Sequence, residues 1–309
     1  MSTSHDSGNG VEWREAQVAA QAKVNLRLRV LAREASGFHQ LETLFLRIDL
    51  ADTVRVRRTE GARSLRVWGD VDLGKIGPAE HNLAWRAADA YLTAAADAGG
   101  FAIEIEKRIP IGGGLGGGSA DAGAVLRALD AMSPAPMGEL RLLQIAASLG
   151  ADVPFLASES AYALAWGRGE RLLSLTPPPK THLVLVVPPF AVNTASAFGW
   201  LAEQRAARAR TPGEVFVLDA ERLAEWSYLQ SVAVNDFESV VCARHPEIAD
   251  VIASLRNDAG LAPAMLSGSG STVFGVVPIS SMLPSIGGGG LGVILTATAT
   301  RVEPVSLIV

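Results

Sequence analysis

A glycine-rich segment at residues 112–118 places the strongest constraint on what this chain can fold into. Six of its seven residues are glycine, and a stretch of helical character follows, beginning near Ser119 and Asp121. Glycine adopts positive φ angles and lets a ligand approach the backbone, but it costs conformational entropy on folding. The N–H groups at the start of a helix are unpaired and, together with the helix dipole, bind anions. The segment therefore predicts a phosphate-binding loop, with Ser119 and Asp121 as candidate helix caps.

The composition indicates a globular enzyme with a large core. The chain has 309 residues, of which 49% are hydrophobic and 19% charged, which is enough for two lobes of ordinary size. A net charge of −5 argues against a nucleic-acid partner, and one cysteine, Cys242, excludes a disulfide or a cysteine-based zinc site within this sequence. No apolar run is long enough to span a membrane, and residues 1–10 are predicted to be a disordered polar tail. We expect a cytoplasmic protein with no membrane partner.

Hydrophobic periodicity predicts the order of strands and helices. Alternating apolar residues from Val18 to Val30 predict a strand with Lys23 and Asn25 on its opposite face. Further strands are expected at residues 44–46, 53–57, 65–68, 101–106, 161–165, 171–175, 183–187, 273–277 and 293–299, the last being the final strand. Helices are expected at residues 82–92, 140–149, 195–210, 246–257 and from the glycine loop to about residue 132.

The arrangement of these elements predicts an α+β fold. The early strands have antiparallel character, and strands and helices mix without the regular alternation of a doubly wound sheet. Pro177–Pro179 is the best candidate for a linker. It divides the chain into predicted lobes at residues 11–176 and 177–309.

Three common phosphate-binding motifs fit the glycine loop poorly. A Walker A loop requires a lysine, and no lysine lies between Lys107 and Lys180. The glycines match the dinucleotide-binding pattern, but that fold needs a second strand ending in an acidic residue, and residues 129–142 are helical or loop in character. A protein-kinase loop needs a downstream His-Arg-Asp segment, which the sequence lacks.

The segment Pro110-x3-Gly114-Leu115-Gly116-Gly117-Gly118-Ser119 resembles the second motif of the GHMP kinases, which include galactokinase and the homoserine, mevalonate and phosphomevalonate kinases. Residues 22–26 and 267–275 resemble the first and third motifs of that family, in the same order along the chain. A narrower resemblance, to the subfamily that acts on a cytidine-diphosphate-linked methylerythritol, is carried by residues 23–26, 37–45, 149–155 and 235–238. Together these motifs span the chain from Ala22 to about Gly275.

The resemblance implies both a fold and an activity. The family fold has two α+β lobes, an N-terminal lobe like domain 2 of ribosomal protein S5 and a ferredoxin-like C-terminal lobe, with the site in the cleft between them. The activity is transfer of the γ-phosphoryl group of ATP, with Mg²⁺, to the 2-hydroxyl of the small-molecule substrate in the non-mevalonate isoprenoid pathway. A monomer or weak homodimer is expected.

The family's catalytic residues fall on Lys23 and Asp152. By resemblance, the Asp152 carboxylate accepts or polarises the proton of the substrate hydroxyl, and the Lys23 ammonium stabilises that carboxylate and the charge on the transferred group. Without the resemblance, Asp152 is better explained as the cap of a short helix, and Lys23 as a residue on the solvent-facing side of a strand; the resemblance reverses that preference. We predict that the two side chains pair.

The family's ligand-binding motifs assign the remaining site residues. Those expected to bind ATP are Pro110, Ile111, Gly112, Gly113, Gly114, Leu115, Gly116, Gly117, Gly118, Ser119, Ala120 and Asp121. Ser119 is also the candidate Mg²⁺ ligand, at a position where the family often has two serines and this chain has Ser119-Ala120. Those expected to bind the acceptor are Asn25, Phe38, His39, Thr194, Phe198, Ser267, Gly268, Ser269 and Gly270.

Within this acceptor set, Phe38 and Phe198 are predicted to lie on either side of the cytosine, and His39 to hydrogen-bond to it. The family commonly has tyrosine at the position of Phe38, so here the ring face is kept and the hydroxyl is not. Packing in a turn or in a helix explains the same three residues without a ligand.

Two other functions remain open on the sequence alone. The chain could be another GHMP kinase, such as a homoserine or phosphomevalonate kinase, which binding of cytidine nucleotides near Phe38 and His39 would exclude. It could also be a non-catalytic binding protein that keeps the fold, and an intact Lys23–Asp152 pair argues against that.

Overall fold

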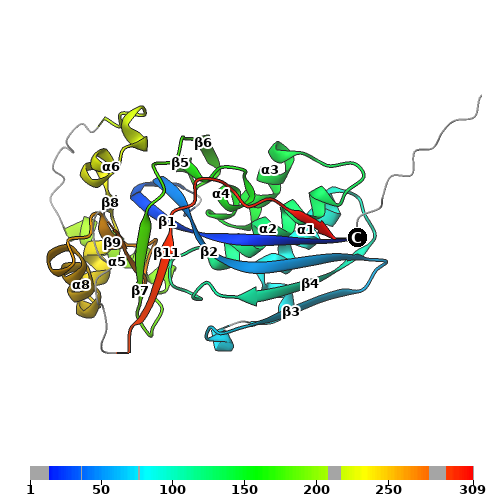
Figure 1. Ribbon diagram of the computed structural model, residues 1–309, viewed down its shortest axis with the longest axis horizontal. Helices are drawn as coiled ribbons and strands as arrows, with labels where there is room; N and C mark the ends of the chain where they lie inside the picture. Colours follow the sequence, from blue (N-terminus) through cyan, green and yellow to red (C-terminus); the bar gives the residue numbers. More distant parts are fainter. Residues whose placement is uncertain (1–13, 36, 76, 208–216, 278–289, 309) are drawn as a thin grey trace, which may run out of the picture.

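The structure is a computed structural model that describes residues 14–35, 37–75, 77–207, 217–277 and 290–308 (Figure 1). The polar tail predicted at residues 1–10 lies outside these ranges, as do the last three residues of the helix predicted at 195–210. The described part of the chain has two sheets with helices packed on them, so the predicted α+β class is confirmed. Within the described residues, no helix is both long and apolar enough to cross a membrane.

The first sheet is built on two long antiparallel strands, β1 (Glu15–Arg33) and β2 (His39–Thr59). The alternation predicted for β1 is confirmed, because Val18, Ala20 and Ala22 are buried on one face. The prediction of separate strands at 44–46 and 53–57 was wrong, because β2 runs continuously through both. Polar residues between them interrupt the apolar pattern, although two of these, Arg47 and Asp52, are themselves buried.

Eight strands of the described residues form this sheet, with the central order β12-β1-β2-β4-β3. Strand β5 adds to β2, β6 adds to β5, and the two-residue β8 adds to β1. Not all early pairs are antiparallel as expected, because β3 and β4 run parallel. The remaining strand bounds are β3 (Arg63–Gly69), β4 (Gly100–Lys107), β5 (Tyr162–Gly167), β6 (Arg171–Ser174), β8 (Val234–Asn235) and β12 (Ser306–Ile308).

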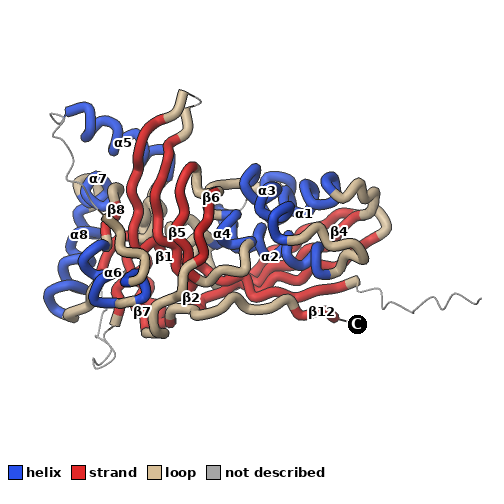
Figure 2. Tube along the Cα trace, turned by 90° about the horizontal axis from the view of Figure 1, so that it is seen from above, coloured by secondary structure: helices blue, strands red, loops and turns tan. Residues whose placement is uncertain are grey.

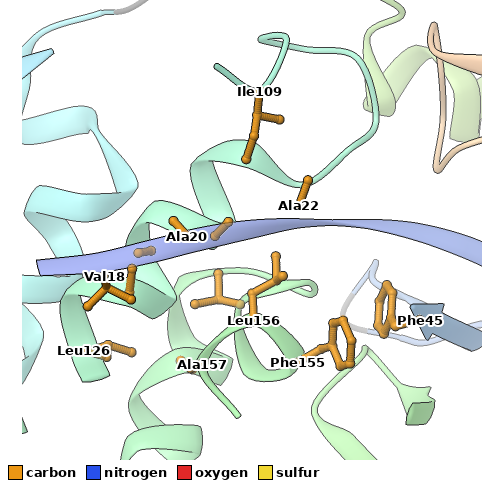
Figure 3. Close-up of a cluster of buried hydrophobic side chains, with 14 of the residues drawn as sticks. Val18, Ala20, Ala22, Phe45, Ile109, Leu126, Phe155, Leu156 and Ala157 are labelled. Atoms are coloured by element: carbon orange, nitrogen blue, oxygen red, sulfur yellow. The ribbon is translucent and has the colours of Figure 1, made fainter. Parts of the chain in front are cut away.

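Helices α1 to α4 pack on one face of this sheet, as Figure 2 shows. Asn82 begins α1 as predicted, since its side chain accepts a hydrogen bond from the backbone N–H of Ala84 at 2.9 Å. In the core, Val18 and Ala20 of β1 lie beside Leu126 of α2 (Figure 3). The helix bounds are α1 (Leu83–Ala94), α2 (Gly117–Ala131), α3 (Glu139–Leu149) and α4 (Val153–Ala157), with short 3-10 turns η1 (Leu73–Lys75) and η2 (Ala79–His81) before α1.

In the described ranges, the second sheet has four antiparallel strands in the order β11-β7-β10-β9. In chain order this is fourth, first, third, second, the order of a ferredoxin-like sheet. Its strands are β7 (His182–Val187), β9 (Ala264–Leu266), β10 (Val273–Val276) and β11 (Gly292–Ala297). The helical segments of this region are α5 (Thr194–Ala207), η3 (Arg222–Ala224), α6 (Trp226–Val232), α7 (Glu238–Cys242), α8 (Pro246–Ala253) and the π-helical turn η4 (Ser254–Asp258).

The two faces of this second sheet join different cores. Val184 and Val186 face Ala197 of α5 and Ile248 of α8, whereas Leu185 on the opposite face belongs to the large core of the first sheet. The second sheet thus lies between its own helices and the first lobe.

The expectation that residues 293–299 form the final strand was wrong. Strand β12 follows β11 and pairs with β1 in the first sheet, where Ile308 lies opposite Glu15. Its three residues are too few for a periodicity signal. The division of the chain at Pro177 remains a prediction.

Candidate active site

Lys23 and Asp152 form an ion pair at the centre of the molecule. The Lys23 Nζ lies 3.3 Å from Asp152 Oδ2, and only 3% of the Lys23 side chain is exposed, against 31% for Asp152. The predicted pairing is confirmed, and the alternative that Lys23 lies on the solvent-facing side of its strand is wrong. A buried ammonium requires partners, because an unpaired charge in the interior is very costly. The pair therefore places a charged lysine beside a carboxylate that solvent or substrate can reach.

Two further hydrogen bonds fix the Lys23 ammonium. Its Nζ donates to Asn25 Oδ1 at 2.7 Å and to the backbone O of Gly114 at 3.0 Å. Asn25 in turn donates from Nδ2 to Thr43 Oγ1 at 2.8 Å, and that hydroxyl donates to the backbone O of Arg27 at 2.7 Å. The two long strands and the glycine loop together set the position of the ammonium.

Asp152 stands at the N-cap position of the short helix α4, directly after the turn that ends α3 at Gly150. Its side chain makes no capping hydrogen bond. The carboxylate is therefore directed to Lys23 and the cleft, and capping does not explain its presence.

The glycine loop requires glycine at specific positions. Gly112, Gly114 and Gly116 have φ angles of +74°, +79° and +74°, in the region that favours glycine. A Cβ on Gly114 would lie 2.1 Å from the backbone O of Ser267, and a Cβ on Gly116 would lie 3.1 Å from Cε of Lys23. The loop therefore lies directly against Lys23 on one side and the C-terminal glycine motif on the other.

The prediction that Ser119 and Asp121 cap the following helix was wrong. The N-cap of α2 is Gly116, without a side-chain cap, so Ser119 and Asp121 are the third and fifth residues of the helix. Because a helix leaves the N–H groups of its first turn without intrahelical partners, the donors of Gly117 to Ser119 are available to a ligand. The Ser119 side chain lines the cleft, whereas Asp121 is buried.

A buried group of charges under the loop was not predicted. Lys107 pairs with Asp121 at 2.7 Å and also with Asp52. The Asp52 Oδ1 accepts hydrogen bonds from the backbone N–H groups of Arg108, at 2.6 Å, and Ile109, at 2.9 Å, which lead into the loop. We call Lys107, Asp52 and Asp121 the buried triad. The sequence did indicate that Lys107 is buried, because it falls at the same alternate positions as the buried residues of β4.

Burial and mutual pairing shift the pKa values within the buried triad. Burial disfavours the Lys107 cation, but the charges of Asp121 and Asp52 outweigh it and raise the pKa of Lys107. Burial raises the pKa of Asp121 to about 7, although the charge of Lys107 opposes the rise. Asp121 Oδ1 has no hydrogen-bond partner. Since the triad ties the residues before the loop to the helix after it, we assign Asp121 a role beneath the loop rather than in contact with phosphate.

The C-terminal glycine motif closes one side of the site. Ser267 Oγ donates to the backbone O of Gly114 at 3.0 Å, and Asn235 Nδ2 donates to the backbone O atoms of Leu266 and Gly268, both at 2.8 Å. The hydroxyls of Ser269 and Thr194 lie 2.8 Å apart. The motif is thus a tight turn held against the phosphate loop, and the same turn serves as a wall of the site.

A cleft of about 1350 Å³ brings most of the predicted side-chain sites together. The predicted residues on its wall are Lys23, Asn25, Phe38, His39, Gly114, Gly116, Ser119, Asp152, Thr194, Phe198, Gly268 and Ser269. Predicted residues that are not part of that wall are Pro110, Ile111, Gly112, Gly113, Leu115, Gly117, Gly118, Ala120, Asp121, Ser267 and Gly270. Among these, Leu115, Ala120 and Ser267 are buried, so they shape the wall from behind.

The predicted base-binding residues are packed against each other and against neighbouring side chains. The rings of His39 and Phe198 are stacked, with centroids 4.6 Å apart and an angle of 14° between their planes. Phe237 meets Phe198 edge-on at 4.9 Å. Aromatic rings in direct contact have centroids at least about 4.5 Å apart, so His39 and Phe198 already touch each other. No base fits between them in this arrangement.

Phe38, the other predicted base-stacking residue, is 57% exposed. The guanidinium of Arg168 lies over its ring, 4.3 Å from the centroid, and that guanidinium also bonds to Glu34. Arg168 was not predicted as a site residue. It lies in a glycine turn between β5 and β6, far from Phe38 in sequence, so only the fold reveals the contact.

Comparison with known proteins identifies the class of this fold and site. Family models for the GHMP kinases N terminal domain and the GHMP kinases C terminal match residues 82–160 and 217–280. The crystal structure of homoserine kinase from Cytophaga hutchinsonii has the same fold, with a TM-score of 0.64 and 18% identity over 99% of this chain and 100% of that chain. The fold is that of a GHMP kinase.

Relatives of higher sequence identity show to which subfamily of the GHMP kinases the chain belongs. The 4-diphosphocytidyl-2-C-methyl-D-erythritol kinases of a Geobacter species and of Desulfotalea psychrophila are 38% and 40% identical, over 85% and 83% of this chain and 90% and 84% of theirs. A crystal structure of 4-(cytidine 5'-diphospho)-2C-methyl-D-erythritol kinase matches with a TM-score of 0.65 and 38% identity, over 84% of this chain and 89% of that chain. The chain therefore belongs to the 4-diphosphocytidyl-2-C-methyl-D-erythritol kinase family of GHMP kinases.

Proposed function

We propose that the protein transfers the γ-phosphoryl group of ATP to the 2-hydroxyl of 4-diphosphocytidyl-2-C-methyl-D-erythritol, giving the 2-phosphate and ADP. The observation that carries this proposal is the Lys23–Asp152 ion pair, which lies against the glycine loop and on the wall of the cleft. Relatives that carry this activity in their names support the choice of acceptor.

The phosphates of ATP bind, in this proposal, at the N-terminus of α2. Gly116 is the N-cap, and Ser119 of the first turn is on the cleft wall. A helix leaves the N–H groups of its first turn without intrahelical partners, and its dipole favours anions there. A side chain at Gly114 or Gly116 would occupy space that the loop needs to approach Lys23 and Ser267. Close approach of backbone to phosphate is thus built into the loop.

The protein ligands available in the cleft fit a Mg²⁺ ion that is coordinated mainly by the nucleotide. No cluster of three or more histidine, cysteine or acidic residues suited to a metal occurs in the part of the chain that the structure describes. Mg²⁺ in kinases is commonly bound by substrate phosphates and one or two protein oxygens, and the Ser119 hydroxyl lines the cleft at the start of α2. A Mg²⁺ ion bound there would neutralise part of the negative charge of the phosphates.

In this proposal, Asp152 and Lys23 have different roles toward the acceptor hydroxyl. The Asp152 carboxylate accepts the hydrogen bond of the attacking hydroxyl and orients it toward the γ-phosphoryl group, because this kind of transfer depends mostly on positioning and charge. The Lys23 ammonium pairs with the carboxylate and stabilises negative charge as it develops on the transferred group. Asn25 and the Gly114 carbonyl hold the ammonium in place for both tasks.

The cytidine end of the acceptor is assigned to the slot around Phe38, His39 and Phe198. The stacked His39–Phe198 pair must separate before a base can lie between Phe38 and Phe198. Burial lowers the pKa of His39, and the charges of Arg33 and Arg205 lower it further, so the imidazole is neutral at neutral pH. A neutral imidazole has one donor and one acceptor nitrogen, which suits the hydrogen-bonding edge of cytosine.

The experiment that tests the proposal measures ADP release with ATP, Mg²⁺ and the cytidylyl acceptor. We expect wild-type turnover that requires the acceptor and is inhibited competitively by CMP, whereas Asp152→Asn lowers kcat by about 10³-fold, in the range of a lost general base. Turnover with homoserine or phosphomevalonate instead of the cytidylyl acceptor would contradict the assignment. A cytoplasmic location and a monomeric or weakly dimeric state remain predictions from the sequence.

A further inference from the structure

Arg47 is a fully buried cation in the middle of β2, directly opposite Lys23 in the pairing of β1 with β2. Only 1% of the residue is exposed. Burial and repulsion from Arg127 lower the pKa of Arg47 to about 9, so it is still charged at neutral pH. A buried guanidinium is costly unless its donors are satisfied, so its partners indicate why it is there.

The partners of Arg47 are backbone carbonyls at the end of α4. Its Nη2 donates to the backbone O atoms of Phe155 at 2.8 Å and Ser158 at 2.9 Å, and its Nε donates to that of Ser160 at 3.0 Å. Phe155 lies in α4, Ser158 is its C-cap, and Ser160 lies in the loop that follows. The Phe155 carbonyl also accepts from the backbone N–H and the hydroxyl of Ser158, so Arg47 adds to these bonds at the end of the helix where the dipole favours a cation. Arg47 thus holds the C-terminal end of the same helix whose first position is Asp152.

A continuous stack of side chains joins the two cations. Lys23 Nζ lies 5.6 Å from the ring centroid of Phe45, the rings of Phe45 and Phe155 are stacked at 4.9 Å, and the guanidinium of Arg47 lies 5.1 Å from the centroid of Phe155. Figure 3 shows Phe45 and Phe155 side by side between β2 and α4. Lys23 therefore meets the start of α4 through Asp152, while Arg47 meets its end.

We propose that Arg47 is a positioning residue for the phosphoryl transfer, acting through α4 to hold the Asp152 carboxylate against Lys23. Helix α4 has five residues, too few to be stable by itself, and its other contacts are mostly apolar. Directional bonds to its carbonyls fix its rotation and translation in a way that apolar packing does not. The proposal rests on the proposed function, since it assigns to Arg47 the placement of that reaction's base.

The first experiment measures hydrogen–deuterium exchange of α4 in the free protein. The amides of Leu156 and Ser158, which bond to the carbonyls of Asp152 and Pro154, report the helix directly. We expect Arg47→Met to accelerate their exchange at least about 10-fold, because local opening no longer breaks the guanidinium bonds. A matched control is Arg27→Met, which removes another buried guanidinium of the first sheet, one whose Nη1 donates to the backbone O of Val232 at 2.9 Å, away from α4. The control should leave exchange in α4 unchanged.

The second experiment is a double-mutant cycle on kcat. We expect Arg47→Met to lower kcat about 30-fold, with less than a twofold change in KM for either substrate, as for a base displaced by a fraction of an ångström. In the Asp152→Asn background the same substitution should have almost no further effect, because the group that it positions is gone. Arg47→Lys, which keeps a cation and one carbonyl bond, should recover part of kcat and serves as the test variant if Arg47→Met does not fold.

The outcomes separate the two proposals. If wild-type protein releases no ADP with the cytidylyl acceptor, the proposed function fails, and exchange in α4 still decides whether Arg47 holds the helix. If Arg47→Met leaves α4 exchange unchanged, or lowers kcat equally in the wild-type and Asp152→Asn backgrounds, Arg47 supports only the stability of the fold and the inference is overturned.

Discussion

Lys23 and Ser267, from opposite ends of the chain, donate hydrogen bonds to the same acceptor, the backbone O of Gly114, each at 3.0 Å. One carbonyl of the glycine loop therefore joins Lys23 of the first motif to the C-terminal glycine motif. The three sequence motifs of this family meet at a single atom, and a displacement of that atom disturbs all three.

Gly114→Ala is expected to impair the loop severely. The residue has a φ of +79°, and a Cβ would lie 2.1 Å from the backbone O of Ser267, so both strain and a clash with main chain oppose the substitution. We expect kcat/KM for ATP to fall at least about 100-fold, the cost of misplacing reacting groups by about an ångström. Gly138→Ala is the matched control, because Gly138 has the same φ of +79° but no atom within 4 Å of the place that a Cβ would take. Equal losses in the two variants would show that strain alone, and not contact with Ser267, matters.

Lys107→Met is expected to destabilise the protein and weaken ATP binding together. The substitution leaves Asp52 and Asp121 buried without their cation, and breaking a buried ion pair by removing one partner costs about 3–5 kcal/mol. Urea unfolding measures this loss, and steady-state kinetics should show a raised KM for ATP because the triad anchors both ends of the loop.

Adding Asp52→Asn to Lys107→Met should recover part of the lost stability, since it removes a stranded charge and keeps an oxygen that can accept from the backbone N–H groups of Arg108 and Ile109. If the double variant is less stable than Lys107→Met, the charges of the triad are not what opposes the single substitution.

Phe198→Ala is expected to raise KM for the cytidylyl acceptor and leave KM for ATP unchanged. Loss of one stacking face costs about 1–3 kcal/mol per base, which corresponds to at least a fivefold change in affinity. The control is Phe190→Ala, because Phe190 also stacks on a histidine, His245, at 4.9 Å, and neither residue is on the wall of the cleft. Calorimetry with CMP checks the result without turnover, and unchanged CMP affinity in Phe198→Ala would remove this residue from the base slot.

Tyr91 is expected to make the protein unstable in alkali. Burial raises its pKa from 10.0 to about 12, and its hydroxyl donates to Asp130 Oδ1 on α2 at 3.1 Å. Above pH 10 the unfolded chain loses this proton while the folded chain keeps it, so stability falls as pH rises from about 10 to 12 and the loss is complete above the folded pKa. Urea unfolding of Tyr91→Phe from pH 9 to 11 should show a smaller decline than wild type, and an equal decline would contradict the assignment.

The sequence was sufficient to predict elements and pairs that follow local rules or family motifs. Alternation located β1, the Asn82 side chain marked the start of α1, and the resemblance led to the Lys23–Asp152 pair. In each case the information lies within a few residues of the element, or in a motif whose geometry is shared by a family.

The missed features depend on burial of charge, which the local sequence pattern indicated only for Lys107, through the alternation of β4. Arg47, Asp52 and Lys107 interrupt apolar stretches and were not assigned roles, because charged residues are usually exposed. Their partners come from distant segments, and only the fold shows that each is satisfied. The stacking of the His39 ring on the Phe198 ring was also missed. It depends on how α5 packs against the tip of the β1–β2 hairpin, which only the fold shows.

The pairing of β8 with β1 limits how the enzyme can move. Residues Val234 and Asn235, which follow the predicted linker, are hydrogen-bonded in register to Arg27 and Leu28 of the first sheet. Rotation of one lobe about a hinge would have to break this ladder, together with the Asn235 bonds that hold the C-terminal glycine motif. These bonds oppose a hinge-like closure of the two lobes, and we expect the substrate to enter through movements of side chains and loop tips.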